Sequence, residues 1–261
     1  MIVNTRRLFA KLLSSLEIGT ICDVGSMDGT DALFFRDVAP DANIYAFEPS
    51  PTNLRLMQAN PALRERRIRL VPMAATNYDG EGEFFVVEAD HAGTDGRRGM
   101  SSLHRRPDHP LIVTSAVLRV KTTRLDTFLT DPNARLALWI DVEGKAYEVL
   151  EGIAGIASRV HLLHVEVETT PCISPGQKLY PEVKALLNRQ GFTEIATDQS
   201  RSQMQFNAVF ARTALPAWTQ LKIRAWLLYG TLRFAIVRGL LRSCPACIRH
   251  LRTIRSRITS A

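Results

Sequence analysis

The chain has 261 residues, of which 46% are hydrophobic and 23% charged, a composition that suits one α/β domain of ordinary size plus an extension. Four cysteines without a signal peptide argue against a disulfide-bonded secreted fold, so we expect a reducing, cytoplasmic location. The sequence contains no run of 18 uncharged apolar residues, which argues against an ordinary membrane-spanning helix.

The net charge of +7 is unevenly distributed along the chain. From residue 199 to the end there is no Asp or Glu, and this stretch holds eleven Lys or Arg residues. The other 198 residues carry 22 basic and 26 acidic residues, a net charge of −4. We therefore expect a mildly acidic domain over residues 1–212 and a basic, helical C-terminal extension over residues 213–261. A tail of this kind suggests an anionic partner, either lipid or nucleic acid.

Taken in chain order, the first part of the sequence alternates between helical and strand patterns. Apolar residues at helical spacing predict a lead-in helix over residues 3–16. Buried strands are predicted over residues 21–24, 44–47 and 68–73. Ser50 and Pro51 have the residue types of a helix N-cap and first helical position, so a helix is expected to begin there.

The remainder of the chain continues the alternation after one long polar stretch. That stretch, residues 89–110, is rich in Gly and Arg, and a loop of this length is usually functional or disordered. Strands are predicted over residues 83–87, 117–122, 136–140, 160–167, 192–196 and 206–210, and helices over residues 125–129 and 181–190, with a further helix ending at Gly152. Alternating strands and helices predict a mostly parallel sheet with helices on both faces.

Polar turns follow the first two strands. Gly25 and Gly29 allow the backbone of the first turn to approach a ligand closely. Glu48 lies 23 residues after Gly25, close to the roughly 20-residue spacing at which an acidic side chain meets a ribose diol. Neither G-x-G-x-x-G nor G-x-x-x-x-G-K-[ST] is present. The acidic turn therefore suits a cationic ligand without phosphates, such as S-adenosylmethionine; the alternative is an ordinary strand–turn–helix with a surface acid.

Five motifs resemble, in their order along the chain, those of FkbM-type methyltransferases. They are Asp23-Val24-Gly25, Phe47-Glu48-Pro49-Ser50-Pro51 with Asn53, Met100-Ser101-Ser102-Leu103, Leu125-Asp126 and Ile140-Asp141-Val142-Glu143-Gly144. The resemblance covers about residues 21–212 and implies a class I, Rossmann-like fold with a seven-stranded, mostly parallel sheet and an antiparallel last strand. It also implies S-adenosylmethionine-dependent methyl transfer, most often to a hydroxyl on a sugar, glycan or other small bacterial metabolite.

The resemblance further implies which residues hold the cofactor. They are Asp23, Gly25, Ser26, Gly29, Glu48, Pro49, Asn53, Ala75, Asn77 and Asp141. Asp23, Gly25 and Ser26 would lie at the methionine end and Glu48 at the ribose hydroxyls. Ala75 and Asn77 would border the adenine, and Asp141 would face the transferred methyl.

The chain departs from the family pattern at three places. Trp139 replaces the usual Lys, Lys145-Ala146 replaces Ala-Glu, and Met27-Asp28 stands where Asn is usual.

The acidic residues at strand ends are candidates for the chemistry. Methyl transfer to an alcohol requires removal of its proton, and Asp141 and then Glu143 are our candidate bases. Asp141 could instead cap the following helix or hold the amine of the cofactor. Ser101, Ser102 and Glu168 are predicted to contact the acceptor; the alternative for the two serines is that they belong to a mobile, solvated loop. Acidic strand ends can also hold a divalent cation, but the spacing is not diagnostic, and no metal is predicted.

The basic extension allows two interpretations. Ile248, Leu251, Ile254 and Ile258 form one helical stripe, which suits peripheral contact with an anionic membrane at its inner face. The stripe would equally suit packing on its own domain or on a second subunit. Cys244 and Cys247 form a lone C-x-x-C, which is weak evidence for metal or redox chemistry.

Two other functions remain open from the sequence. One is an RNA-modifying methyltransferase that uses the basic tail. We do not expect a nucleic-acid partner, because the aromatic residues near the tail are needed as apolar cover; they are Trp218, Trp226, Tyr229 and Phe234. The other is a non-catalytic membrane-associated binding module, suggested by Ala146 at the position of the family's Glu.

Overall fold

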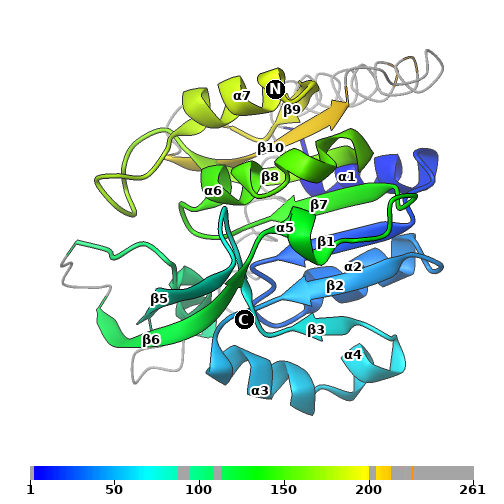
Figure 1. Ribbon diagram of the computed structural model, residues 1–261. Helices are drawn as coiled ribbons and strands as arrows, with labels where there is room; N and C mark the ends of the chain where they lie inside the picture. The colour runs from blue at the N-terminus through cyan, green and yellow to red at the C-terminus, as the bar shows by residue number, and fades with distance from the viewer. Residues whose placement is uncertain are drawn as a thin grey trace, which may run out of the picture. The chain divides into compact units, whose positions relative to one another are not determined.

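The computed structural model describes residues 3–87, 95–107, 113–199 and 204–212, together with Leu221 and Ala225 (Figure 1). The chain divides into two compact units, one of residues 2–214 and one of residues 215–261 with Met1. The predictions about the basic extension, its helical stripe, Cys244 and Cys247 lie outside the described residues.

A seven-stranded sheet forms the centre of the first unit, with strand order β3-β2-β1-β7-β8-β10-β9. Its strands are β1 (Thr20–Val24), β2 (Asn43–Phe47), β3 (Arg69–Val71), β7 (Leu136–Ile140), β8 (Val160–Glu168), β9 (Phe192–Thr197) and β10 (Gln205–Arg212). Neighbouring strands are parallel except that β10 runs antiparallel to both β8 and β9. The predicted seven-stranded, mostly parallel sheet with an antiparallel last strand is confirmed.

The strand order changes direction at β1. From β1 the chain adds β2 and then β3 on one side, and it later adds β7 on the other side of β1. Open parallel sheets bind ligands beyond the carboxyl ends of their strands at such a switch point. Every residue of β1 and of β7 is buried, which explains why both read as apolar runs in the sequence. The fold therefore directs attention to the residues that follow Val24, Phe47 and Ile140.

Helices cover the two faces of this sheet (Figure 1). On one face, α1 (Thr5–Ser15) packs on β8 and β10 and lies beside α2 (Thr30–Val38). On the other, α6 (Ala146–Glu151) and α7 (Tyr180–Arg189) pack on each other and on β8. The remaining helices are α3 (Pro51–Ala59), α4 (Pro61–Glu65), α5 (Leu125–Phe128), η1 (Asp95–Met100) and η2 (Ala154–Arg159).

The expected helix beginning at Ser50-Pro51 is α3. Its N-cap hydroxyl on Ser50 accepts a hydrogen bond from the Asn53 N–H. The expected lead-in helix over residues 3–16 is α1, and the helix expected to end at Gly152 is α6. These helix boundaries are confirmed to within a few residues. They could be predicted because each depends on a local cap or on apolar spacing.

A second, three-stranded sheet departs from the predicted pattern. It has the order β4-β6-β5 and consists of β4 (Ala74–Ala75), β5 (Gly80–Val87) and β6 (Thr114–Thr123). The predicted strand over residues 68–73 is too long, because β3 ends at Val71 and the chain then pairs with β6. Part of the predicted loop over residues 89–110 is also ordered, since η1 forms within it and Ser102 makes a bridge with Phe85.

Among the described residues, none of the helices combines the length and the apolar character needed to cross a bilayer.

Candidate active site

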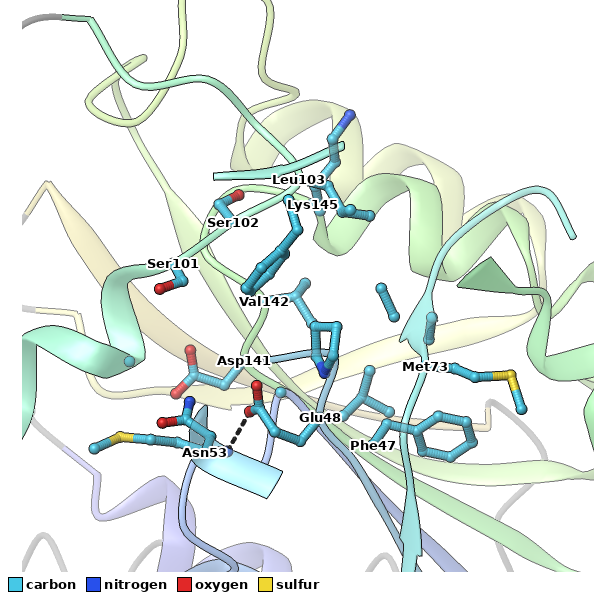
Figure 2. Close-up of a pocket in the computed structure, with 18 of the residues that line it drawn as sticks. Phe47, Glu48, Asn53, Met73, Ser101, Ser102, Leu103, Asp141, Val142 and Lys145 are labelled. Carbon is cyan, nitrogen blue, oxygen red and sulfur yellow. Dashed lines mark hydrogen bonds between the residues drawn. The ribbon is translucent and has the colours of Figure 1, made fainter. Parts of the chain in front are cut away.

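A cleft lies beyond the carboxyl ends of β1, β2 and β7 and contains about 520 Å³ of empty space, which includes space open to solvent. Glu48 and Asp141 both line it, and Ser101 and Ser102 reach it from another segment (Figure 2). Eight of the predicted site residues line this cleft: Gly25, Glu48, Pro49, Asn53, Ala75, Ser101, Ser102 and Asp141.

Gly25 occupies the tightest position of the first turn. Its φ is +87°, and a Cβ there would lie 1.7 Å from the Asp141 carbonyl oxygen. The Asp141 N–H donates to the Val24 carbonyl at 2.9 Å, so the turns after β1 and β7 are in direct contact. A glycine is needed at this position because any side chain would overlap the backbone of Asp141. Glycine also leaves space on the side where the cleft passes.

Glu48 is buried, and its two oxygens are held by backbone donors. Oε2 accepts from the Met27 N–H and Oε1 from the Ser50 N–H, both at 2.8 Å. Burial raises the pKa of Glu48 to about 7, while these bonds, one from the Asn53 side chain and the charge of Arg98 act in the opposite direction. The sequence did not reveal the part played by Met27, whose φ of +55° turns its N–H toward Glu48.

Asp23, Ser26 and Gly29 lie outside the lining of the cleft. Asp23 is buried and accepts a hydrogen bond from the Ser26 hydroxyl at 2.5 Å, and burial raises its pKa to about 8. Gly29 also has a positive φ of +81°, but a Cβ there would meet the side chain of Leu63. These three residues shape the turn and the start of α2 in the structure.

The two residues implied for the adenine lie in different surroundings. Ala75 lines the cleft, whereas Asn77 lines a neighbouring polar cavity and donates from its side chain to Glu151 Oε2 at 2.8 Å. Leu103 and Lys145 border both cavities.

Beside the cleft, four carboxylates gather at the ends of β7 and β8. One oxygen from each of Asp141, Glu143 and Glu166 lies within 4.8 Å of the others. Gln205 donates to Glu166 at 2.8 Å and to Glu168 at 3.4 Å. Three oxygens this close could hold a divalent cation; the structure itself shows them joined to one another and to neighbouring side chains.

The environment favours protonation within this group. Burial raises the pKa of Glu166 and of Asp141, and the two side chains share a hydrogen bond that favours a proton on Glu166. Asp141 is open to the cleft, yet the protein around it removes much of its hydration. Burial also raises the pKa of Glu168 to about 7. A cluster that shares protons in this way can accept one from a neighbouring hydroxyl.

The hydroxyls of Ser101 and Ser102 are engaged with the protein. Ser101 Oγ lies 3.0 Å from the Val87 N–H, whose hydrogen bond it accepts. Ser102 Oγ donates to the Glu143 carbonyl at 2.7 Å and accepts from the His104 N–H. Both residues line the cleft, while their hydroxyls fix the segment that carries them.

The family departure at Trp139 does not line the cleft. Its side chain stacks on His164 with ring centroids 3.4 Å apart and contacts Phe9 and Phe35 beneath α1 and α2. Lys145, in contrast, borders the cleft and pairs with Glu148 at 2.8 Å.

The sequence motifs and the geometry of the cleft agree with the comparison against known families. Residues 23–194 match the family described as Methyltransferase FkbM domain. The chain belongs to this family. Its membership confirms the predicted family and, with it, S-adenosylmethionine as the predicted cofactor.

One similar relative of this FkbM-family chain is the 2-O-methyltransferase NoeI of Sinorhizobium fredii. It is 26% identical over 153 residues, a match that covers 56% of this chain and 62% of the relative, less than two thirds of its length.

Solved structures similar to this chain include the following two. The magnesium protoporphyrin IX methyltransferase of Synechocystis PCC 6803, with bound SAH, is 12% identical with a TM-score of 0.43, over 80% of this chain and 81% of that one. A rRNA methylase from Streptococcus thermophilus is 16% identical with a TM-score of 0.43, and the match covers 81% of this chain and 98% of that one.

Proposed function

We propose that this protein is an S-adenosylmethionine-dependent O-methyltransferase whose acceptor is a hydroxyl on a sugar, a glycan or another small metabolite. The observation that carries the proposal is that Glu48 and Asp141, from the ends of two different strands, line one cleft. The name of the similar relative, a 2-O-methyltransferase, supports oxygen as the methylated atom.

The residues of the cleft fit this cofactor. Glu48 offers carboxylate oxygens for ribose hydroxyls, and the Gly25 backbone leaves room for the amino-acid end. Met73, Phe84 and Val142 provide apolar walls for the adenine or the methyl-bearing part. Pro49, Asn53 and Ala75 border the same space, while Asp23, Ser26 and Gly29 would act by holding the first turn. When bound, the cofactor supplies an electrophilic methyl group on a sulfonium.

Asp141 is the proposed base. Its carboxylate faces the cleft, and the hydrogen bond donated by protonated Glu166 favours the ionised form of Asp141, which can then take the proton of the acceptor hydroxyl. Glu143, Glu168, Ser101 and Ser102 would then form the acceptor side of the site. Much of the rate of such an in-line transfer comes from holding the reacting atoms in position, which the contact between the β1 and β7 turns supports.

The basic extension is proposed to hold the protein at an anionic membrane surface, at the inner face. Its support is the charge distribution: eleven basic and no acidic residues from residue 199 to the end. Such a position would suit a glycan acceptor built on a lipid.

A labelling experiment tests the proposed reaction. The purified protein is incubated with methyl-labelled S-adenosylmethionine and separated glycan, lipid, protein and RNA fractions of bacterial cells. We expect label in the glycan, lipid-linked glycan or small-metabolite fraction, and less with Asp141→Asn. Label confined to RNA would overturn the proposal in favour of an RNA methyltransferase, and absence of both cofactor binding and transfer would favour a binding module.

A further inference from the structure

One arginine beside the cleft joins two segments that are distant in the sequence. Arg106 Nη2 lies 2.6 Å from Glu143 Oε2, and the side chains of these two residues are only 9% and 17% exposed. The same guanidinium donates from Nε and Nη2 to the Met100 carbonyl, at 3.1 and 3.0 Å. Arg106 therefore connects the end of η1 with the loop that follows β7.

A second contact reaches the same loop. Ser102 Oγ donates to the Glu143 backbone carbonyl at 2.7 Å, and the backbone of Ser102 exchanges two hydrogen bonds with Phe85. Glu143 itself has a φ of +50°, a conformation that a side-chain-bearing residue adopts only where its surroundings hold it. Both contacts therefore act on one constrained residue of the loop that carries Asp141.

The segment that Arg106 holds forms a wall of the cleft. Arg98, Gly99, Ser101 and Leu103 line it, and Gly99 packs so closely on Met27 that a Cβ would lie 3.0 Å from the thioether sulfur. Arg106 is not among the described residues that line the cleft. Its influence on a ligand would be exerted through this wall and through the loop after β7.

We propose that Arg106 is a positioning residue that fastens residues 98–103 to the loop of residues 141–144, so that the two walls of the cleft form together. This inference rests on the proposed function for the identity of the ligand, but the fastening itself is a property of the cofactor-free protein. A fork-shaped guanidinium suits the task because one group can serve both Glu143 and Met100.

Hydrogen exchange of the cofactor-free protein tests the fastening directly. We expect Arg106→Met to speed exchange of amides in residues 98–104 by about tenfold or more, the loss expected for a hydrogen bond to a charged group. Arg106→Lys should be intermediate, because an ammonium keeps the charge but cannot reproduce the fork. Arg119→Met is the matched control, since it removes an exposed ion pair with Glu81 from the same small sheet.

Calorimetry with S-adenosylhomocysteine supplies the second readout. Arg106→Met should weaken binding by about tenfold, and the double variant with Glu143→Met should bind no more weakly than Arg106→Met alone. Glu143→Gln, which keeps the size of the side chain, tests the same pair should Arg106→Met fail to fold.

The proposal would be overturned if Arg106→Met showed the same exchange rates and the same affinity for S-adenosylhomocysteine as Arg119→Met. It would also be overturned if the double variant lost as much affinity as the sum of the losses in the two single variants. A wild-type protein that binds no S-adenosylhomocysteine would contradict the proposed function, while the exchange measurement would still decide the fastening.

Discussion

Gly25 and Gly29 look equivalent in the sequence but have different tasks in the structure. Both have positive φ values, yet Gly25 abuts the backbone of Asp141, whereas Gly29 faces the flexible end of the Leu63 side chain. We expect Gly25→Ala to lower the free energy of unfolding by at least about 3 kcal/mol, because backbone atoms cannot move aside cheaply. Gly29→Ala should cost about 1–2 kcal/mol, mainly for its conformation.

Urea unfolding of the two variants checks this difference. Gly25→Ala should also lose cofactor binding, since the turns after β1 and β7 would separate. Equal losses of stability in the two variants would show that the contact between Gly25 and Asp141 is not as tight as described.

Asp141 has two candidate roles that one substitution separates. If Asp141 is the base, Asp141→Asn should reduce kcat by about 10²–10⁴-fold while leaving the affinity for S-adenosylhomocysteine nearly unchanged. Steady-state kinetics combined with calorimetry measures both quantities. A large loss of affinity with an unchanged kcat would instead assign Asp141 to holding the cofactor amine.

The strands explain why acids accumulate at one edge of the sheet. Asp23 lies on β1, Glu48 directly after β2 and Glu168 at the end of β8. Burial raises the pKa of Asp23 to about 8 and the pKa values of Glu48 and Glu168 to about 7. The folded protein therefore retains protons that the unfolded chain releases at lower pH. The stabilisation is fully present below about pH 4 and is lost as the pH rises through about 7–8.

We expect the free energy of unfolding of the cofactor-free protein to fall as the pH rises from about 4 to about 8, between the pKa values of these groups in the unfolded and folded states. Glu48→Gln should flatten this slope by up to about 1.4 kcal/mol per pH unit, because one proton is no longer taken up. Glu65→Gln, at an exposed position on α4, should leave the slope unchanged. Urea midpoints across this pH range provide the test, and a slope that Glu48→Gln does not alter would refute it.

The elements show what local sequence can predict. The central strands were predictable because β1 and β7 are buried throughout, and α3 because its cap and first proline are adjacent in the sequence. The pairing of residues 74–75 in the small sheet could not be predicted, because their partners Thr122 and Thr123 come much later in the chain.

The same reasoning applies within the cleft. Glu48 and Asp141 follow apolar runs, so their position at the sheet edge could be predicted. The partners of Ser101 and Ser102 could not, because Val87 and Glu143 lie on other elements. The contribution of Met27 depends on a backbone angle that carries no sequence signal of its own.

At the scale of the whole molecule, the uneven charge gives a prediction for the extension. The full-length protein should sediment with vesicles containing anionic lipid, and less at high salt. Replacing Arg249, Arg252 and Arg257 with Gln should weaken this binding by about a hundredfold, at about 1 kcal/mol for each residue near the surface. Equal binding to neutral vesicles, or no effect of the substitutions, would contradict a membrane role.

Calorimetric titration of the purified protein with S-adenosylmethionine, compared with Glu48→Ala, is the most direct measurement of cofactor binding in the cleft. We predict one bound equivalent, weakened in Glu48→Ala by about 1–3 kcal/mol through loss of hydrogen bonds to a carboxylate, with Glu65→Ala as the unaffected control. Two results would contradict the assignment of this cleft. One is no binding at about 1 mM cofactor, since a dissociation constant of that size corresponds to a binding free energy of only about 4 kcal/mol. The other is an affinity that Glu48→Ala leaves unchanged.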